Sequence, residues 1–506
     1  MKKRSLVISA IAALTVATAL AGCGSTYYFA GRKLPPSGLP YRVLIAVQNP
    51  SALSKGALAI VDAYFDIRSG YNGTPTSFSI GGYGGALPIT IQNMPEEQRG
   101  AVYGAGDGSF TFVNYQTEKA SGSVSNLPVP SASIFATRNG QYVFAASQVS
   151  HLFTIANQSG GGIISLSLPG VYRVSVNPGG SAVLAFVQNS DYAYYPVQLT
   201  SQQGIQFSGG PSTWPTAAVD CEPQNAPAWC LFQAQSPDSL DKTGEFYTGA
   251  PLKFDRPVKA VWSADGGTAY VLNCGPECGG VASSYSVLPV APLIFTLGKN
   301  SGLLPCNSAP CTNSKTTPMT TVAIRGGASN ALVDSSTMYV VGQCPELVSS
   351  FGQCQSAPSS QTYWGGNLTV VNLATNQATS QVPISDGQPG LISRMVEADD
   401  NTLWIGMSEC TNGIRYAANS ATGYGCLTMY NTSTNTVTLL EPYLGDATGI
   451  AAVIGLHKIY TAEGGQVYIY ATSDGTAIDN QYVTVTGTAY DVAFMDALTD
   501  GDNTVY

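Results

Sequence analysis

The sequence predicts an all-β protein built from repeated four-stranded sheets. From Tyr41 onward, short runs rich in β-branched and aromatic residues recur between turn dipeptides, and no helical periodicity of useful length interrupts them. The recurring unit is a strand, a Gly-containing turn and a second strand, after which two further strands follow. Four antiparallel strands per unit, repeated along the chain, are typical of a β-propeller.

The first two strands of the unit are clearest at three places. They read ASIFATRNGQYVFAAS at 132–147, YRVSVNPGGSAVLAFV at 172–187 and KAVWSADGGTAYVLNC at 259–274. The dipeptides Asn139-Gly140 and Asp265-Gly266 supply the positive φ that tight hairpins require. Weaker copies lie at 330–344, 393–410 and 449–465, third strands at 152–160, 367–377, 426–435 and 466–475, and fourth strands at 162–170, 379–387 and 480–487.

The stretch SADGGTAYVLN at 263–273 resembles the YVTN-type β-propeller repeat family. The resemblance implies a propeller over most of residues 41–506 and carries no catalytic residue, because its motif is structural. Counting units gives eight blades, with seven as the alternative because residues 200–256 do not divide clearly. A lone strand at 488–497 is expected to pair with the strand at 41–49, so that strands from both ends of the chain close the ring.

The N-terminus predicts export. Lys2, Lys3 and Arg4 precede an apolar run at 6–20 that is too short for a permanent membrane span, which indicates a cleaved signal at 1–22. The sequence Leu20-Ala21-Gly22-Cys23 resembles the lipobox of bacterial lipoproteins, in which this cysteine becomes the acylated N-terminus; an ordinary signal peptide is the alternative. Residues 23–40 then form an acylated tether that anchors a propeller at 41–506 to the cell envelope. Gly24 after the cysteine favours the outer membrane or cell surface, if the cell has two membranes and follows the enterobacterial sorting pattern.

The charge of the chain excludes one class of partner. The formal net charge is −9, only 10% of residues are charged, and loss of the basic signal would make the mature chain more acidic. Such a body repels phosphate backbones, so the sequence predicts no nucleic-acid binding.

The cysteines predict disulfides. Apart from Cys23, ten cysteines fall into five local pairs, and an exported chain meets an oxidising environment. The expected pairs are Cys221 with Cys230, Cys274 with Cys278, Cys306 with Cys311, Cys344 with Cys354 and Cys410 with Cys426. A zinc site made of Cys274, Cys278, Cys306 and Cys311, or crossed pairing among those four, is the alternative.

Strand alternation places three of these pairs on one face. Cys274, Cys344 and Cys410 each end a second strand, so their loops should project together. His151, before a third strand, should lie on the same face. Loops that are closed by a disulfide, which we call stapled loops, are pre-organised for binding. Protection of the loops from proteases is the alternative role. Trp214 and Trp229 are further candidates for exposed contact.

No catalytic constellation is evident. His457 falls in a turn on the opposite face from His151, no nucleophile elbow is present, and Asp399-Asp400 and Asp500/Asp502 fit turns better than metal sites. The sequence therefore predicts no metal, no cofactor and a binding or scaffold module for a protein or envelope polysaccharide. A propeller hydrolase or lactonase with a metal in the central channel is the alternative.

Overall fold

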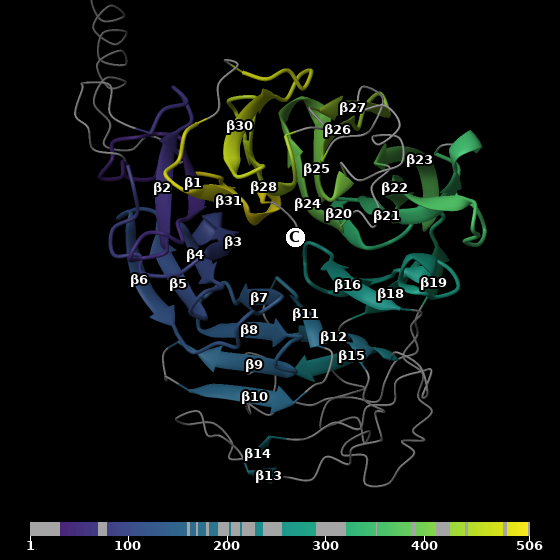
Figure 1. Ribbon diagram of the computed structural model, residues 1–506, viewed down its shortest axis with the longest axis horizontal. Coiled ribbons are helices and arrows are strands. Elements are labelled where there is room, and N and C mark those ends of the chain that lie inside the picture. Colours follow the sequence, from purple (N-terminus) through teal and green to yellow (C-terminus); the bar gives the residue numbers. More distant parts are fainter. Residues whose placement is uncertain are drawn as a thin grey trace, which may run out of the picture.

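The computed structural model shown in Figure 1 describes most of the chain. The described residues are 31–68, 78–158, 162–167, 171–178, 182–190, 202–203, 213–214, 228–235, 256–289, 320–350, 352–385, 391–410, 426–440, 444–478 and 483–503. They form β-strands joined by turns, loops and short 3₁₀ segments, and none of them lies in an α-helix. No helix in these ranges is long and apolar enough to cross a membrane.

Five sheets contain four antiparallel strands in sequential order. Their strands are β3 (Pro88–Met94), β4 (Arg99–Gly104), β5 (Ser109–Asn114) and β6 (Lys119–Val124); β7 (Ser133–Ala136), β8 (Tyr142–Ser147), β9 (Leu152–Asn157) and β10 (Ile163–Ser167); β16 (Pro257–Trp262), β17 (Thr268–Asn273), β18 (Ser284–Pro289) and β19 (Thr320–Ala323); β20 (Asn330–Asp334), β21 (Thr337–Leu347), β22 (Thr362–Asn372) and β23 (Gln377–Ser385); and β24 (Leu391–Ala398), β25 (Thr402–Ser408), β26 (Leu427–Asn431) and β27 (Thr436–Leu440).

Three further sheets show three described strands each. They are β2 (Gly56–Asp62), β1 (Arg42–Gln48) and β31 (Thr488–Phe494); β11 (Val171–Val176), β12 (Ala182–Ser190) and β15 (Ala228–Gln235); and β28 (Ala447–Val453), β29 (Lys458–Glu463) and β30 (Gln466–Ala471). A two-stranded pair, β13 (Gln202–Gln203) with β14 (Thr213–Trp214), lies apart from these sheets in Figure 1.

The sheets surround a common axis, so the expectation of an all-β propeller is confirmed (Figure 1). The turns at Asn139-Gly140 and Asp265-Gly266 join β7 to β8 and β16 to β17, and Gly140 and Gly266 have φ of 67° and 68°, as the turn chemistry predicts. The expected four strands per unit are present in the five four-stranded sheets.

Apolar side chains on both faces of the strands make the core, because each sheet is covered by a neighbour on either side. One cluster joins Phe112 of β5 to Val143 of β8, and another joins Leu403 of β25 to Val341 of β21. A third packs Tyr460 of β29 against the sheet that contains β1 and β31. Fully buried strands of this kind read as apolar runs instead of strict alternation, as in YVFAAS of β8.

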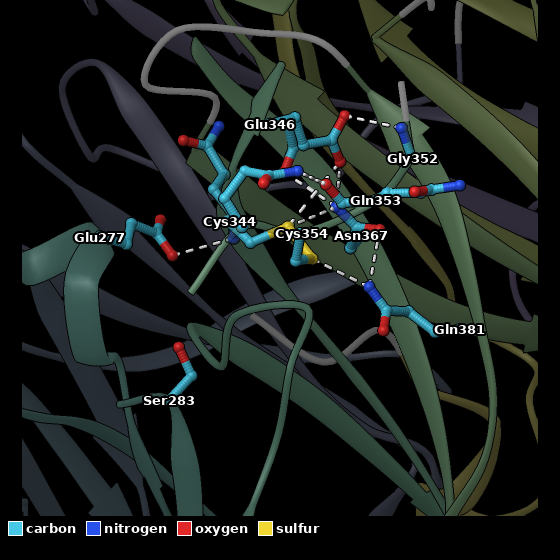
Figure 2. Close-up of a disulfide and its surroundings, with 12 residues drawn as sticks. Glu277, Ser283, Cys344, Glu346, Gly352, Gln353, Cys354, Asn367 and Gln381 are labelled. Carbon is cyan, nitrogen blue, oxygen red and sulfur yellow. Dashed lines mark hydrogen bonds between the residues drawn. A yellow bond between two sulfur atoms is a disulfide. The ribbon is translucent and has the colours of Figure 1, made fainter. Parts of the chain in front are cut away.

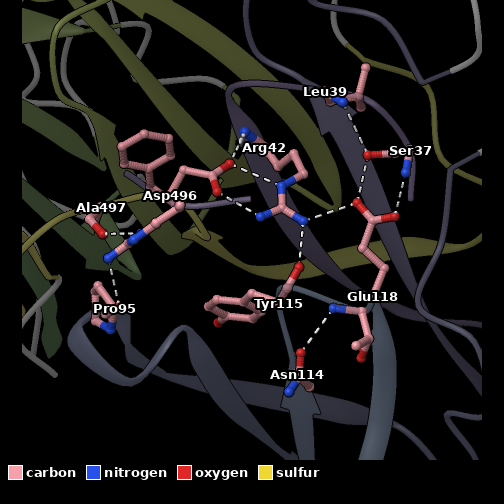
Figure 3. A network of polar contacts seen from close by, with 12 residues as sticks. Ser37, Leu39, Arg42, Pro95, Asn114, Tyr115, Glu118, Asp496 and Ala497 are labelled. Carbon is pink, nitrogen blue, oxygen red and sulfur yellow. Dashed lines mark hydrogen bonds and ion pairs between the residues drawn. The ribbon is translucent and has the colours of Figure 1, made fainter. Parts of the chain in front are cut away.

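Strands from the two ends of the described chain meet in one sheet. β1 pairs antiparallel with β2 on one side and with β31 on the other, with Val43 opposite Phe494. Arg42, the first residue of β1, also binds Asp496 just beyond β31 and Glu118 beyond β5 (Figure 3). The last part of the predicted tether contacts the propeller as well, since Arg32 donates to the carbonyl oxygens of Ala497 and Pro95.

Several of the strands nearest the axis, although not β7 or β20, share an irregularity. In β3, β11, β16, β24 and β28 the register with the second strand shifts near the start of the strand, and β31 shifts against β1 in the same way. A bulge inserts an extra residue and redirects the side chains that follow it. The residues directly after the shift include Arg173, Lys259 and Arg394.

Candidate binding sites at the loop face and the axis

Three stapled loops lie at the same end of three successive sheets. Disulfides join Cys274 to Cys278, Cys344 to Cys354 and Cys410 to Cys426, which confirms three predicted pairs. The first cysteine of each pair lies near the end of a second strand, just beyond β17 or β25 or within the last paired residues of β21. Because Cys274 and Cys278 are bonded to each other, they are not zinc ligands. The pairs Cys221/Cys230 and Cys306/Cys311 lie outside the residues whose side chains the structure describes.

Two of these loops are in direct contact. The 3₁₀ segment η2 (Gly275–Cys278) places Glu277 beside β21, and a carboxylate oxygen of Glu277 accepts a 2.9 Å hydrogen bond from the backbone N–H of Gln343, next to Cys344 (Figure 2). Burial raises the pKa of Glu277 to about 7, against which the Gln343 hydrogen bond acts. The carboxylate therefore serves the contact between neighbouring sheets.

Glu346, near the end of β21, lies beside the Cys344–Cys354 disulfide and is fully buried. Its carboxylate accepts hydrogen bonds from Asn367 Nδ2 at 2.7 Å, the Gly352 N–H at 2.8 Å and the Tyr363 hydroxyl at 3.1 Å (Figure 2). A buried carboxylate is stable only when such donors replace water.

Amide side chains also surround the disulfide. Asn367 Nδ2 lies 3.0 Å from Cys344 Sγ, and Gln381 Nε2 lies 2.9 Å from Cys354 Sγ. Among the residues that the structure describes, Cys344, Glu346 and Cys354 are the group close enough to hold a metal. The two sulfurs are bonded to each other, so this cluster is a structural one that shapes the loop.

The remaining predicted contact residues are not gathered at these loops. His151 lies in the turn between β8 and β9, and the sheet of β11, β12 and β15 separates it from the sheet of Cys274. Trp214 belongs to β14 and Trp229 to β15, but their side chains lie outside the described part of the chain. Their roles in binding stay predictions.

His457 lies beside two aspartates, Asp399 and Asp400, and the sequence did not predict this contact. It lies in the turn between β28 and β29, and its Nδ1 is 3.0 Å from Asp400 Oδ2 in the 3₁₀ segment between β24 and β25. The hydrogen bond and the charge of Asp400 raise the pKa of the His457 imidazole. Asp399 accepts backbone N–H groups from Gly455 and His457, so this aspartate pair links two turns.

Three basic residues lie on inner strands near the axis, and the sequence analysis did not predict this arrangement. Arg173 of β11, Lys259 of β16 and Arg394 of β24 each follow the register shift of an inner strand. A signal was present, because YRV, VKA and SRM place a basic residue at the same position of the repeat. We call Arg173, Lys259 and Arg394 the axial cations.

Polar contacts connect the axial cations to neighbouring inner strands. Arg173 Nη1 lies 3.4 Å from the carbonyl oxygen of Val258, which precedes Lys259. Lys259 Nζ donates to Asn330 Oδ1 of β20 at 2.5 Å, and Arg394 Nε lies 3.9 Å from Asp491 Oδ1 of β31.

The protonation of these groups reflects burial. Burial, and then the charges of Arg173 and Arg394, hold the pKa of the Lys259 ammonium well below its usual range. Burial raises the pKa of Asp491 to about 6, against the opposing effect of Arg394. The three cations therefore share one electrostatic environment.

Comparison with known proteins supports the fold. No protein-family model matches the sequence, and no curated protein matches it in sequence. Among solved structures, a dihydro-heme d1 dehydrogenase, NirN, in complex with DHE is 9% identical with a TM-score of 0.51, covering 91% of this chain and 79% of that chain.

Two further solved structures are also similar. A periplasmic gluconolactonase, PpgL, from Pseudomonas aeruginosa is 12% identical with a TM-score of 0.40, covering 90% of this chain and 98% of that chain. The hydrazine synthase of Kuenenia stuttgartiensis is 13% identical with a TM-score of 0.44, covering 80% and 99%. At such identities the likeness concerns the β-propeller fold alone, and the YVTN-type repeat stays a resemblance.

Proposed function

We propose that this protein is a lipid-anchored, extracytoplasmic β-propeller that binds a protein or an envelope polysaccharide through its stapled loops. The sequence carries the proposal of export and acylation at Cys23. In the same proposal, the pairing of β31 with β1 closes the ring of blades.

The observation that carries the binding role is the joined pair of stapled loops. The Cys274–Cys278 and Cys344–Cys354 loops come from adjacent sheets, and Glu277 links them through the Gln343 N–H. Loops held in this way lose less conformational entropy when a partner binds. Exposed polar residues in the second loop and just after it, including Gln353, Ser356 and Gln361, are available for contact.

The alternative, a hydrolase or lactonase with a metal at the axis, is disfavoured by the axial cations. A divalent cation near Arg173 and Arg394 would be repelled by their guanidinium groups. Metal analysis of the purified chain lacking residues 1–22 tests this alternative, since one tight stoichiometric ion would favour the enzyme.

The binding role is tested by capture from intact cell envelope with the purified chain. We expect specific partners to be retained, and Gln353→Arg combined with Ser356→Arg to reduce their recovery at least tenfold. Ser433→Asp, in the exposed turn between β26 and β27, is the matched control and should leave recovery unchanged. Recovery at background level, or equal recovery with both variants, would contradict the proposal.

The anchor is tested separately by mass spectrometry of the mature protein. We expect an N-terminus at Cys23 that carries acyl groups. Retention of residues 1–22 would overturn the anchor while leaving the binding test intact.

A further inference from the structure

The sheet of β2, β1 and β31 receives the predicted tether at one of its ends. Arg42 begins β1 and lies opposite Asp62, the last residue of β2. Val43 lies opposite Phe494, the last residue of β31. The segments before β1, after β2 and after β31 therefore all leave the sheet at this end, which we call the tether end.

Each of these three segments exposes a large apolar side chain. The exposed fractions are 48% for Leu34, 57% for Tyr64 and 42% for Leu498, and we call these three residues the tether-end patch. Phe65 is 53% exposed and packs edge-on against Tyr64, with 4.9 Å between the ring centroids. The other exposed large apolar residues of the described chain lie singly in four different connections: Leu53, Val129, Val149 and Val281. Apolar side chains gathered at one place on a surface mark a binding site.

The turn that carries the aromatic pair is held in place. The backbone N–H of Tyr64 donates to Asp62 Oδ1 at 2.9 Å. Lys458 Nζ, at the start of β29, donates to the carbonyl oxygen of Ala63 at 3.0 Å and forms a 2.6 Å ion pair with Asp66. The exposure of Tyr64 is therefore a property of an anchored turn.

Arg32 limits how far the proposed anchor can lie from this patch. Its Nη1 donates at 2.9 Å to the carbonyl oxygen of Ala497, which precedes Leu498, and Leu34 lies two positions after Arg32. Cys23 and Arg32 are nine positions apart, so even an extended chain between them spans at most about 32 Å. An acyl group on Cys23 therefore keeps the bilayer close to the tether end.

The charges at the tether end are compatible with a membrane surface. Asp66 pairs with Lys458, and Glu118 pairs with Arg42. Lys33, in the tether itself, is exposed. Anionic lipid headgroups attract such a cation.

The stapled loops lie at the opposite end of the propeller. Lys458 contacts the tether end, and its neighbour His457 contacts Asp400 just before the start of β25. Cys410 lies just beyond the other end of β25, a strand of seven residues that spans about 20 Å. A bilayer at the tether end therefore leaves the stapled loops facing away from it.

We propose that the tether-end patch rests on the surface of the lipid bilayer that holds the anchor. This inference rests on the acylation of Cys23 in the proposed function and adds an orientation to it, with the stapled loops directed away from the membrane. Tyrosine is enriched at membrane interfaces, and leucine side chains enter the boundary between headgroups and acyl chains. The anchor makes this weak contact intramolecular, which raises its occupancy without a larger apolar surface.

Quenching of tryptophan fluorescence by brominated lipid tests the proposal. The purified chain that begins at Cys23 is coupled through the Cys23 thiol to a maleimide lipid in phosphatidylcholine vesicles, with or without bromine on the acyl chains. Tyr64→Trp and Leu498→Trp each place a tryptophan in the patch. We expect bromine to reduce the fluorescence that each substitution adds to that of the unaltered chain at least twofold.

The matched control is Leu53→Trp, at an exposed apolar position between β1 and β2, at the other end of the same sheet. Its added fluorescence should be the same with and without bromine. Quenching at both patch positions and not at Leu53→Trp supports the proposal, and any other pattern overturns it. Two patch positions are used so that a single misfolded variant, detected by a lowered unfolding temperature, does not decide the result.

The failure of this inference is distinguishable from the failure of the proposed function. The maleimide lipid replaces the acyl group, so the quenching measurement does not depend on whether cells acylate Cys23. Acylation is tested by mass spectrometry of the mature protein, and the binding role of the stapled loops by capture from cell envelope.

Discussion

Arg42 shows how one residue joins distant parts of the chain. Its guanidinium forms a 2.6 Å ion pair with Asp496 and a 3.0 Å ion pair with Glu118, and it donates to the carbonyl oxygen of Tyr115 (Figure 3). Glu118 also accepts hydrogen bonds from the Ser37 N–H and hydroxyl. All three charged side chains are at least nine-tenths buried, so each depends on the others to replace water.

Replacing Arg42 should therefore be strongly destabilising. We expect Arg42→Met to lower the free energy of unfolding by about 3–5 kcal/mol, because two buried carboxylates lose their cation. Chemical denaturation measures the change. The matched control is Arg138→Met, which breaks an exposed pair of contacts with Glu96 and Asp500 and should cost about 1 kcal/mol or less. Similar losses in the two variants would contradict this account.

The raised pKa of Glu277 predicts that the stability of the folded protein depends on pH. Its pKa of about 7 in the folded protein exceeds its ordinary value of 4.5, so the folded state holds the proton more tightly than the unfolded chain. The free energy of unfolding should therefore fall as pH rises from about 5 through 7, and Glu277→Gln should remove that part of the slope. Denaturation between pH 5 and 8 measures it.

The control for this measurement is Glu97→Gln, at an exposed carboxyl group. This variant should keep the slope of the unaltered protein. Identical slopes for the Glu277 and Glu97 variants would show that Glu277 does not hold its proton in the folded state.

At the scale of elements, the stapled loops differ in the length of chain they close. The Cys344–Cys354 bond joins residues 10 apart, and the Cys274–Cys278 bond joins residues 4 apart. We expect Cys344→Ala with Cys354→Ala to lower the free energy of unfolding by about 3 kcal/mol, since the longer loop gains more freedom in the unfolded chain. Cys274→Ala with Cys278→Ala should cost about 2 kcal/mol. Denaturation with and without a thiol reductant measures both, and a larger loss for the shorter loop would contradict the entropic explanation.

At the scale of the whole molecule, the sheet of β2, β1 and β31 allows a test of whether the propeller needs strands from both ends of the chain to pair. β31 packs Val492 and Phe494 into the core shared with β28–β30, and Asp496 follows it to meet Arg42. A chain ending at Gly487 should lose cooperative unfolding, because β1 and β28 would both expose apolar faces. A chain ending at Asn503 keeps β31 and should unfold cooperatively. Calorimetry distinguishes them, and a cooperative transition in the shorter chain would show that the propeller does not need β31.

Local patterns determined the features that depend on neighbours in sequence. Turn dipeptides such as Asn139-Gly140 and Asp265-Gly266, the apolar runs beside them and the short spacing of Cys344 and Cys354 were enough to predict hairpins, an all-β propeller and three disulfides. These features follow from backbone geometry and loop closure within a few residues. Strand order along the chain was also enough to predict that β31 meets β1.

Only the tertiary structure decided which groups meet across sheets. Arg42 and Asp496 are 454 positions apart, and the contact between Glu277 and the Gln343 N–H joins two repeats. The axial cations occupy equal repeat positions, but the direction of their side chains depends on bulges that appear when the strands pair. Hydrophobic alternation specifies that a side chain is buried, whereas the assembly of the sheets around the axis determines what it is buried against.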